Sequence, residues 1–387
     1  MSCDVFLYVQ HLLGIGHLRR ASVLARSFHQ AGLEVTFVSG GRPVPHLNVT
    51  GARFIQLPSL HAADNSFKIL EDESGQIVDE KWKSARSEIL LRAFREAKPK
   101  VLLLEMFPFG RRQMRFELDP LIALAKEMSV PVLTSVRDIL TTHKTPGKSE
   151  WIIKRVKTDI DHVLVHGDPR FIPLEDSFPL ANQITDKIIY TGYVLDSLSV
   201  STPKSKRNSD NSSHRKGVLV SAGGGAVALP LAETVLAAKA LCSLNNVPWL
   251  LLLGDNLPES DFHDLVSRAP KGLIIERNRP DFPTLLTQAQ LSISQAGYNT
   301  ILETLAAETP AIVVPFAAEG QSEQTTRAEL LAARGVLQIL MERDLTPSAL
   351  ATAIDQCLAG IRGDIALDMK GAEKSTSFIK ELIQKQG

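Results

Sequence analysis

The sequence has little cysteine and no net charge. Its three cysteines, Cys3, Cys242 and Cys357, lie far apart among 387 residues and cannot all pair with one another. This excludes a disulfide framework of the secreted type and favours a reducing compartment, so we expect a cytoplasmic protein. The 43 basic and 43 acidic residues cancel, which argues against a broad polyanion-binding surface. We therefore expect no nucleic-acid partner.

Long hydrophobic segments are also missing. The apolar run at 247–253 falls well short of the roughly 20 residues that span a bilayer. The apolar run at 5–9 is followed by Gln10 and His11, and no basic region precedes it. We therefore expect a first strand there rather than a signal peptide, and no segment that crosses a membrane.

Several motifs are incomplete or absent. Arg19 stands where the third glycine of the dinucleotide fingerprint G-x-G-x-x-G belongs. The glycine run at 223–225 lacks the Gly-Lys-Ser/Thr ending of an ATPase loop, and the histidines and cysteines show no metal-ligand spacing. We therefore expect no resident cofactor and no catalytic metal ion.

Short apolar strands alternate with helical segments along the chain, which indicates an α/β protein. At the N-terminus, VFLYV is followed by the glycine loop HLLGIGH, an amphipathic helical segment at 21–28 and the strand LEVTFVSGG. The pattern restarts at Gly217, after a polar stretch rich in serine and lysine. We expect two Rossmann-like domains that face a cleft. Their ranges are 1–198 and 217–387, joined by a linker at 199–216, and we leave open whether the last helix packs back on the first domain.

The segment GIGHLRR, at 14–20, lies between the first strand and its helix. Gly14 and Gly16 allow a ligand to approach the backbone, and the helix N-terminus behind them favours an anion or a polarised hydroxyl. His17 would then be a general base with a pKa suited to neutral pH. A tight turn whose histidine is satisfied by the backbone explains the same residues equally well.

The segment SAGGGA, at 221–226, is the equivalent loop of the second domain. Gly223, Gly224 and Gly225 expose backbone N–H groups that suit a diphosphate. A flexible turn is the alternative interpretation.

The segment TILE, at 300–303, has the form of a capping box, in which Glu303 reaches back to the N-cap backbone. The alternative is that Glu303 accepts the two hydroxyls of a ribose, as acidic residues do in other nucleotide sites. Gly297 opens the turn before it, and EGQSEQ follows the next strand with amides suited to sugar hydroxyls. This context favours the ribose interpretation.

Together these segments resemble the two-domain GT-B glycosyltransferases, and most closely family 28, which includes the N-acetylglucosaminyltransferase that forms lipid II. The resemblance covers most of the chain and is strongest at 217–335. SAGGGA is similar to the family's phosphate loop, and SQAGYNTILE to its donor-binding segment with the ribose-binding glutamate. EGQSEQTTRA is similar to the segment that holds the donor sugar, and GIGHLRRASVLA to the N-terminal glycine loop with its histidine.

The resemblance implies a metal-independent, inverting glycosyltransferase. It implies transfer from a nucleotide diphosphate sugar, with UDP as the nucleotide, to a hydroxyl of a lipid-linked or cell-envelope acceptor. The first domain would bind the acceptor, with His17 as the base, and the second domain would bind the donor. The donor-side residues predicted in this way are Ser221, Gly223, Gly224, Gly225, Arg279, Ser294, Gly297, Asn299, Thr300, Glu303, Gln321 and Gln324.

Arg20 leaves other functions open. G-x-G-H-x-x-R is the pattern of the nucleotide-sugar hydrolases of nonulosonate biosynthesis, which give the sugar to water. If His17 activated water, the product would be a free sugar. Those hydrolase chains are shorter, whereas this chain has a large N-terminal domain. A nucleotide-sugar sensor that binds without turnover is the third function considered.

A basic loop with aromatic neighbours, FPFGRRQMRF at 107–116, follows a predicted strand. It could seat a lipid phosphate or touch an anionic membrane surface, which would place the protein at the inner face of the cell membrane. A solvated basic turn is the alternative. The segment that begins SVRDIL at 135 occupies the place where family 28 enzymes contact the acceptor. The predicted acceptor-side residues are Gly14, Gly16, Arg20, Arg111, Arg137 and Asp138; the oligomeric state is left open.

Overall fold

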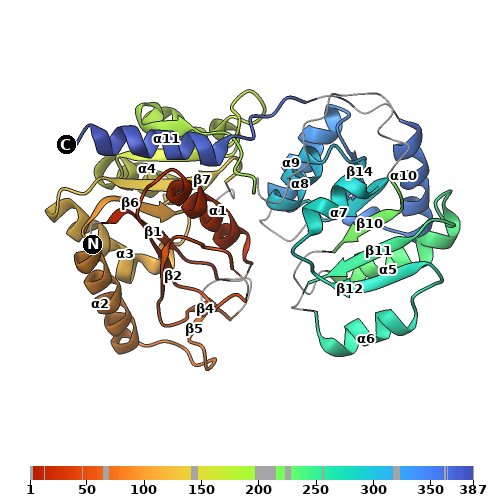
Figure 1. The fold of residues 1–387 in the computed structure, drawn as a ribbon, viewed down its shortest axis with the longest axis horizontal. Coiled ribbons are helices and arrows are strands. Elements are labelled where there is room, and N and C mark those ends of the chain that lie inside the picture. The colour runs from red at the N-terminus through yellow and green to blue at the C-terminus, as the bar shows by residue number, and fades with distance from the viewer. Residues whose placement is uncertain are drawn as a thin grey trace. The chain divides into compact units, whose positions relative to one another are not determined.

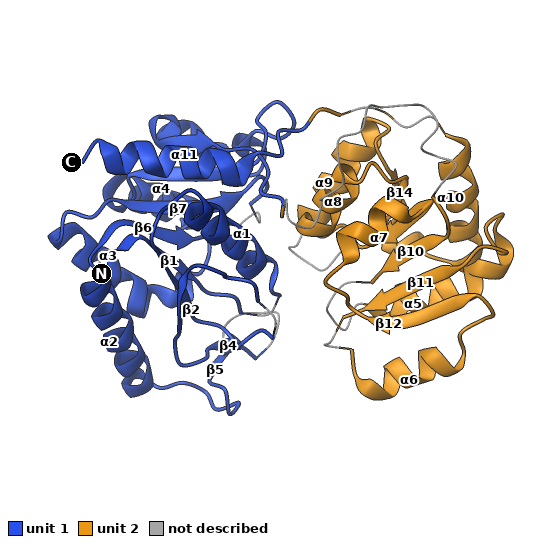
Figure 2. Cartoon of the chain, viewed as in Figure 1, with its two compact units in different colours: residues 1–195, 367–387 blue, residues 196–366 orange. Residues whose placement is uncertain are grey.

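The chain divides into two compact units (Figure 2). Residues 1–195 and 367–387 form unit 1, and residues 196–366 form unit 2. The structure is a computed structural model. It describes residues 3–12, 14–45, 47–63, 69–140, 147–196, 215–222, 228–254, 257–316, 323–360, 363 and 365–386.

Unit 1 is built on a parallel sheet with the strand order β3-β2-β1-β6-β7-β8-β9 (Figure 1). The strands are short apolar runs whose residues are mostly buried, as expected for a sheet covered on both faces. A separate antiparallel pair joins β4 (His61–Ala62) to β5 (Leu70–Glu71). The strands of the main sheet are β1 (Cys3–Val9), β2 (Val35–Ser39), β3 (Arg53–Gln56), β6 (Pro99–Glu105), β7 (Val132–Arg137), β8 (His162–His166) and β9 (Ile188–Tyr190).

Helices cover both faces of this sheet because side chains alternate along each strand. Val5 and Leu7 of β1 pack in one apolar cluster with Leu24 of α1 and Ile379 of α11. Phe6 of β1 packs in the other cluster, with residues of α2, α3 and α4. The helices are α1 (Gly16–Gln30), α2 (Glu80–Ala97), α3 (Arg115–Glu127), α4 (Lys148–Asp159) and α11 (Gly371–Gln384), with short 3-10 turns η1 (Arg112–Met114), η2 (Leu174–Asp176) and η3 (Pro179–Lys187).

The last helix, α11, belongs to unit 1. Ile379 is fully buried in its core. The hydroxyls of Thr376 and Ser27 are 2.7 Å apart, and Nζ of Lys380 donates to the carbonyl of Ala31 over 2.8 Å. The C-terminal segment therefore packs on α1, the first helix of the chain.

Unit 2 repeats the architecture with a parallel sheet ordered β12-β11-β10-β13-β14-β15. One face packs against α5, α6 and α10, and the other against α7 and Ala307, the residue that follows α8. The strands are β10 (Val218–Ser221), β11 (Trp249–Leu253), β12 (Leu273–Arg277), β13 (Leu291–Ser294), β14 (Ala311–Val313) and β15 (Gln338–Ile339). The helices are α5 (Ala228–Ala238), α6 (Glu259–Ser267), α7 (Phe282–Gln288), α8 (Tyr298–Ala306), α9 (Glu323–Ala333) and α10 (Pro347–Ala359), with 3-10 turns η6 (Lys239–Leu241) and η7 (Glu342–Asp344).

Both sheets have the doubly wound order in which the winding reverses between two central strands. The reversal falls between β1 and β6 in unit 1 and between β10 and β13 in unit 2. Ligands of such sheets bind at this switch point, beyond the carboxyl ends of the strands. The predicted α/β class with two Rossmann-like units is confirmed.

The predicted linker at 199–216 lies outside the described residues except for Arg215 and Lys216. The backbone N–H of Lys216 donates to the carbonyl of Gln288 over 2.9 Å. Arg215 donates to the carbonyl of Ala307 over 2.8 Å and to the hydroxyl of Thr309 over 2.9 Å. These two residues therefore belong to unit 2.

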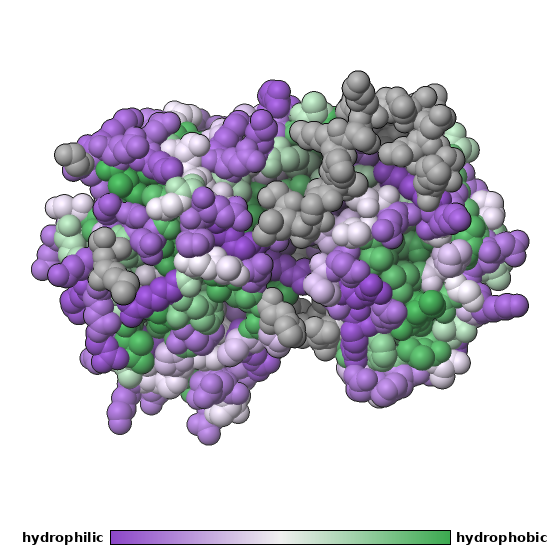
Figure 3. Space-filling model, in the orientation of Figure 1, coloured by the Kyte–Doolittle hydropathy of each residue, from purple (hydrophilic) through white to green (hydrophobic). Residues whose placement is uncertain are grey.

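The visible surface of unit 1 is mostly hydrophilic, with apolar side chains showing between the polar ones (Figure 3). Among the helices that the structure describes, none combines the length and the apolar character needed to cross a membrane.

Candidate active site

Three polar side chains meet at the carboxyl edge of the unit 1 sheet. His17 follows β1 as the second residue of α1, Glu105 ends β6, and Arg137 ends β7. These strands are neighbours at the switch point, so parallel pairing gathers residues as many as 120 positions apart. The glycine loop predicted to include His17 ends before this residue in the structure, because α1 begins at Gly16. The N–H of Arg19 donates to the carbonyl of Ile15 over 2.9 Å.

A buried carboxylate holds the imidazole of His17. Its Nδ1 lies 2.9 Å from Oε1 of Glu105, whose side chain is 1% exposed. The hydroxyl of Ser135 donates to Oε2 of Glu105 over 2.9 Å, and Arg20 donates to Oε1. Because a carboxylate only accepts, the network assigns the proton of His17 to Nδ1 and leaves a lone pair on Nε2. This is the tautomer that a general base needs.

Glu105 is a site residue that the sequence analysis missed. It ends an apolar strand, and its partner His17 is 88 positions away in the chain. The usable signal was a charged residue at the carboxyl end of an otherwise apolar, buried strand, because a buried carboxylate requires partners.

Arginines predicted on the acceptor side surround this histidine. Nη2 of Arg137 donates to Nε2 of His17 over 2.5 Å. Arg20 is 3% exposed and binds Glu105, while Arg111 donates Nε to the carbonyl of Gln10 over 2.7 Å. Arg111 is close enough to His17 to influence its pKa. The structure therefore brings the four predicted residues His17, Arg20, Arg111 and Arg137 together within unit 1.

Burial and neighbouring positive charge both disfavour the imidazolium form of His17. Burial is the main reason that its pKa lies well below 6.5, and Arg137, Arg111 and Arg20 lower it further. Burial and then Arg137 likewise lower the pKa of Arg111 to about 10. The carboxylate of Glu105, which holds Nδ1, is shared with Arg20 and Ser135. His17 is therefore neutral at neutral pH.

Glu105→Gln tests whether this carboxylate positions His17. The amide keeps the size of the side chain but loses the charge that orients the Nδ1 proton. We expect kcat to fall by on the order of tenfold, which is at the lower end of the loss seen when a residue that orients a functional histidine is replaced. Donor affinity should stay unchanged. Glu105→Asp should recover part of the rate because it restores the charge. An unchanged kcat together with a lower melting temperature would show a structural role only.

A second buried ion pair anchors the loop that precedes the site. Arg86 donates to Glu117 over 2.8 Å, and both side chains are fully buried. Arg86 also donates to the side-chain oxygen of Gln10 over 2.7 Å. The carbonyl of Gln10 accepts the hydrogen bond from Nε of Arg111. This network therefore holds both the loop after β1 and one of the site arginines.

The other predicted acceptor-side residues are Asp138, Gly16 and Gly14. Asp138 is 0% exposed, and its carboxylate accepts from the N–H of Ile139 over 2.9 Å and the hydroxyl of Tyr193 over 3.2 Å. This carboxylate is buried against groups of unit 1, and its contact with an acceptor stays a prediction. Gly16 is the first residue of α1. A Cβ built on Gly14 would meet no described atom within 4 Å, so ligand approach there stays a prediction.

The donor-side residues of unit 2 gather at the corresponding switch point. Ser221 ends β10 and Ser294 ends β13, and the two are register partners in neighbouring strands. Gly297 is the N-cap of α8, so this helix starts shortly after β13. The predicted glycines Gly223, Gly224 and Gly225 follow Ser221 closely in the sequence, but they and Gln321 lie outside the described residues.

The capping box predicted at 300–303 is wrong. Because Gly297 has the extended backbone of an N-cap, α8 begins at Tyr298, and Thr300 is already helical. No side chain caps this helix, and the carbonyl of Thr300 accepts from the hydroxyl of Thr304 over 2.7 Å. Asn299 lies in the first turn, and Glu303 follows further along α8, half-buried. The capping-box alternative is therefore excluded, and ribose binding by Glu303 stays a prediction.

Two other donor-side residues contact protein groups. Arg279 lies beyond the edge strand β12. It donates to Asp281 over 2.7 Å and to Glu276 over 3.1 Å, and these hydrogen bonds raise its pKa. Gln324, in the first turn of α9, accepts from the N–H of Phe316 over 3.2 Å with Oε1. Their roles toward a donor stay predictions.

The sequence contains one Asp-x-Asp tripeptide, 159–161, a form that binds metal ions in some sugar-transfer enzymes. Here it precedes β8, at the amino edge of the sheet, away from the site. Asp159 pairs with Lys126 and Arg155, and Asp161 accepts from the N–H of Val132 over 2.7 Å. In the part of the chain that the structure describes, no group of three or more His, Cys, Asp or Glu side chains could hold a metal ion.

Two of the three aromatic residues in the predicted basic loop are buried, whereas Phe116 is half-buried. Phe107 and Phe109 are 0% and 2% exposed and belong to the core of unit 1, so they offer no surface to a membrane. Arg112 and Arg115 lie over the indole of Trp151, with 5.2 and 5.6 Å between guanidinium carbon and ring centroid. Of the mixed surface predicted at 107–116, the structure keeps the half-buried Phe116 and the arginines stacked on Trp151 of α4.

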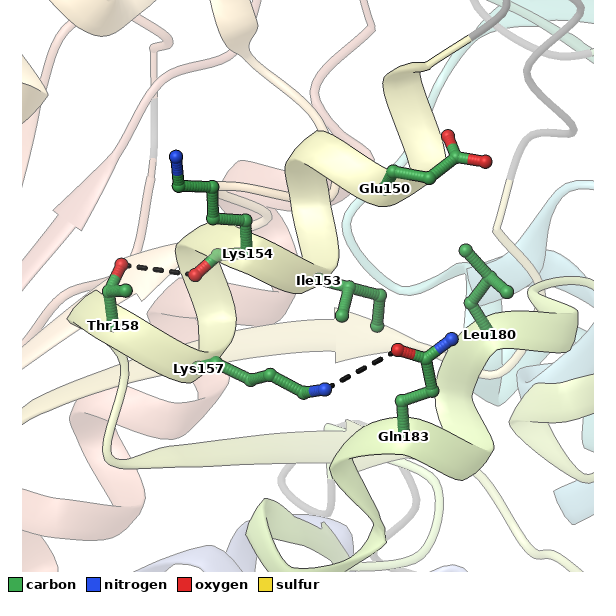
Figure 4. Close-up of a pocket in the computed structure, with 7 residues that line it drawn as sticks. All are labelled: Glu150, Ile153, Lys154, Lys157, Thr158, Leu180 and Gln183. Carbon is green, nitrogen blue, oxygen red and sulfur yellow. Dashed lines mark hydrogen bonds between the residues drawn. The ribbon is translucent and has the colours of Figure 1, made fainter.

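A surface pocket of about 350 Å³ lies between α4 and η3 (Figure 4). Nζ of Lys157 donates to Oε1 of Gln183 over 3.4 Å across it. None of its lining residues belongs to the candidate site. They are Glu150, Ile153, Lys154, Lys157, Thr158, Leu180 and Gln183.

Parts of this chain are similar in sequence to known proteins. Residues 218–385 match the model of the Glycosyltransferase family 28 C-terminal domain. A UDP-N-acetylglucosamine--N-acetylmuramyl-(pentapeptide) pyrophosphoryl-undecaprenol N-acetylglucosamine transferase of Natranaerobius thermophilus is 32% identical over 98 residues, 25% of this chain and 26% of the relative. A transferase of the same description from Bacillus cytotoxicus is 24% identical over 242 residues, 62% of each chain. The chain thus spans less than two thirds of the length of these curated relatives.

Solved structures share the whole fold. The crystal structure of Acinetobacter baumannii MurG has a TM-score of 0.57 at 18% identity and covers 99% of both chains. The S. aureus MnaA–UDP structure has a TM-score of 0.63 at 11% identity and covers 99% of this chain and 97% of its own. At these identities the likeness concerns the fold alone. The fold is that of the two-domain GT-B proteins. Within that fold, the match of residues 218–385 to the family 28 C-terminal domain supports a family 28 glycosyltransferase.

Proposed function

We propose that this protein is a glycosyltransferase that moves a sugar from a UDP-sugar to a hydroxyl of a lipid-linked acceptor. The observation that carries the proposal is the pair of His17 and Glu105 at the switch point of unit 1, in a chain with the family 28 C-terminal domain. The names of the relatives supply the rest of the proposal, since they specify a UDP-sugar donor and an undecaprenol-linked acceptor.

In the proposed reaction, the acceptor oxygen attacks the anomeric carbon on the face opposite the diphosphate. A new C–O bond forms, the bond to the diphosphate oxygen breaks, and its electron pair leaves with the diphosphate. Nε2 of His17 accepts the hydroxyl proton. Inversion at the anomeric carbon follows from this single displacement, and the scheme requires no metal ion.

The donor would be held by unit 2. In this proposal, backbone N–H groups of the glycine loop 223–225 stabilise the charge that develops on the leaving diphosphate. Glu303 accepts the ribose hydroxyls, and Gln321 and Gln324 orient the sugar. A lipid-linked acceptor further requires contact with a membrane surface, for which Arg112 and Arg115 are the candidate residues.

Release of nucleoside diphosphate from a panel of UDP-, GDP- and dTDP-sugars, each with and without a bacterial lipid extract, tests the proposal. We expect release from a UDP-sugar that depends on the extract. Release in buffer alone, with free sugar formed, would instead make the protein a nucleotide-sugar hydrolase. Saturable binding of a nucleotide sugar without release in either condition would make it a sensor.

A further inference from the structure

Hydrogen bonds extend beyond Glu105 along the carboxyl edge of the unit 1 sheet. The hydroxyl of Ser135, in β7, lies 2.9 Å from Oε2 of Glu105 and 2.8 Å from Nε2 of His166, the last residue of β8. Nδ1 of His166 lies 2.8 Å from the hydroxyl of Thr191, the residue after β9. Because β6, β7, β8 and β9 are consecutive in the parallel sheet, these four residues form a polar row that leads to His17.

The polar row is buried, so the protons in it must face acceptors. Its four members, Glu105, Ser135, His166 and Thr191, are each 2% exposed or less. A donor or acceptor that is buried without a partner lowers the stability of a protein. The row therefore has a preferred direction of donation, and its one charged member, Glu105, sets that direction.

The carboxylate of Glu105 can only accept hydrogen bonds. A hydrogen bond to a charged acceptor is stronger than one to a neutral ring nitrogen, so the single hydroxyl proton of Ser135 belongs to Glu105. The oxygen of Ser135 then accepts from His166, which places a proton on Nε2 of that ring. His166 is neutral at neutral pH, because burial, and then Arg20, lower its pKa well below 6.5. Its Nδ1 is therefore an acceptor for the hydroxyl of Thr191.

Thr191 favours this tautomer of His166. Its hydroxyl lies 2.8 Å from Nδ1, compared with 3.1 Å and 3.3 Å from the carbonyls of Gly192 and Val165. In the opposite tautomer, Nδ1 would donate to Thr191, and the lone pair on Nε2 would draw the proton of Ser135 away from the carboxylate. The tautomer of His166 thus determines which way the hydroxyl of Ser135 points.

We propose that His166 is a positioning residue for the base His17 and acts on it through Ser135 and Glu105. By donating from Nε2 to Ser135, His166 directs the serine proton to Oε2 of Glu105. That hydrogen bond holds the carboxylate with Oε1 toward His17, which keeps the imidazole proton on Nδ1 and the lone pair on Nε2. The inference rests on the proposed function, since it takes His17 as the base.

Imidazole nitrogen NMR of the full-length wild-type protein tests the direction of donation without any need for turnover. The two histidine signals are assigned by their loss in His17→Gln and His166→Gln. We expect the proton of His166 on Nε2 and the proton of His17 on Nδ1. A proton on Nδ1 of neutral His166 would overturn the inference, because Ser135 would then donate to His166 instead of Glu105.

Variants of the polar row test whether it acts on His17. Ser135→Ala removes the donor to Glu105, and we expect kcat to fall by on the order of tenfold, with the His17 signal shifted toward a mixture of its two tautomers. His166→Leu should lower kcat by roughly threefold, because the serine still reaches Glu105 but no longer has a fixed orientation. KM for the donor should not change in either variant.

Two further variants separate positioning from packing. His166→Gln keeps an N–H close to the place of Nε2, so it should recover most of the rate that His166→Leu loses. The matched control is His162→Leu, because His162 is half-buried at the other end of the same strand and outside the polar row. It should leave kcat and the His17 signal at their wild-type values.

Double variants test whether the residues act through one another. His166→Leu should cause no further loss of kcat in Ser135→Ala protein, and Ser135→Ala should cause little further loss in Glu105→Gln protein. Additive losses in folded proteins would overturn the inference and leave His166 a role in core packing only. If His166→Leu does not fold, the wild-type tautomers and the pair of Ser135→Ala with Glu105→Gln still test the inference.

The two readouts also separate this inference from the proposed function. If no nucleotide sugar releases its nucleoside diphosphate, the proposed function fails, whereas the predicted tautomers and the shifted His17 signal in Ser135→Ala would still establish the polar row. If release depends on His17 but folded Ser135→Ala and His166→Leu match wild type in kcat and in the His17 signal, the function stands and this inference fails.

Discussion

His17→Ala is expected to reduce turnover by a factor on the order of 10² to 10⁴, the usual contribution of a positioned general base. Donor affinity should stay close to the wild-type value, because His17 belongs to unit 1 and the donor is assigned to unit 2. Rates of nucleoside diphosphate release and calorimetric titration with UDP measure the two quantities separately. Activity within a few-fold of wild type would remove His17 from the mechanism.

The pH dependence of the wild-type protein gives an independent check on the same residue. A base is active when neutral, and the pKa of His17 in the free protein lies well below 6.5 because of burial and the nearby arginines. The acid limb of kcat/KM reports the free enzyme. We therefore expect it well below pH 6.5. A limb at or above pH 6.5 would contradict the assignment of His17 as the essential base.

Glu303→Ala is expected to weaken donor binding by on the order of a hundredfold, since two hydrogen bonds from ribose hydroxyls to a charged carboxylate would be lost. Any change in thermal stability would not come from loss of a helix cap, because the N-cap of α8 is Gly297 and no side chain caps that helix. Titration with UDP and a melting curve measure both effects.

The matched control for Glu303 is Glu329→Ala, an exposed glutamate on α9 of the same unit. It should leave UDP affinity and stability unchanged. If Glu303→Ala binds UDP as tightly as wild type, the ribose assignment is wrong, whatever happens to its melting temperature.

The alternation of strands and helices was predictable because it is a local property. The runs VFLYV, VLLLE and WLLLL are too apolar for a surface and too short to span a membrane, and they form β1, β6 and β11. Parallel sheets covered on both faces need such runs. Boundaries were less certain, because α1 begins at Gly16 and α8 at Tyr298, each earlier than the pattern indicated.

The direction of individual side chains was not predictable from the pattern of residue types. Phe107 and Phe109 lie just before two arginines in the sequence, but burial of their rings in the unit 1 core removes them from the surface. Asp138 has the charge of a ligand-binding residue, yet it is fully buried and binds Tyr193. Whether a polar residue faces a ligand or the core depends on the elements packed around it.

The sequence by itself determined the α/β class of this protein, the two-unit plan and the placement of His17 and Ser221 between a strand and the helix that follows it, His17 at the start of the helix and Ser221 at the end of the strand. Those features follow from hydrophobic periodicity and from glycines within a few positions of one another. Only the tertiary structure decided that Glu105 holds His17, that Arg137 covers its other nitrogen and that α11 returns to unit 1. These contacts join residues 88 to 120 positions apart, or the two ends of the chain, because parallel pairing of β1, β6 and β7 brings their carboxyl ends to one edge.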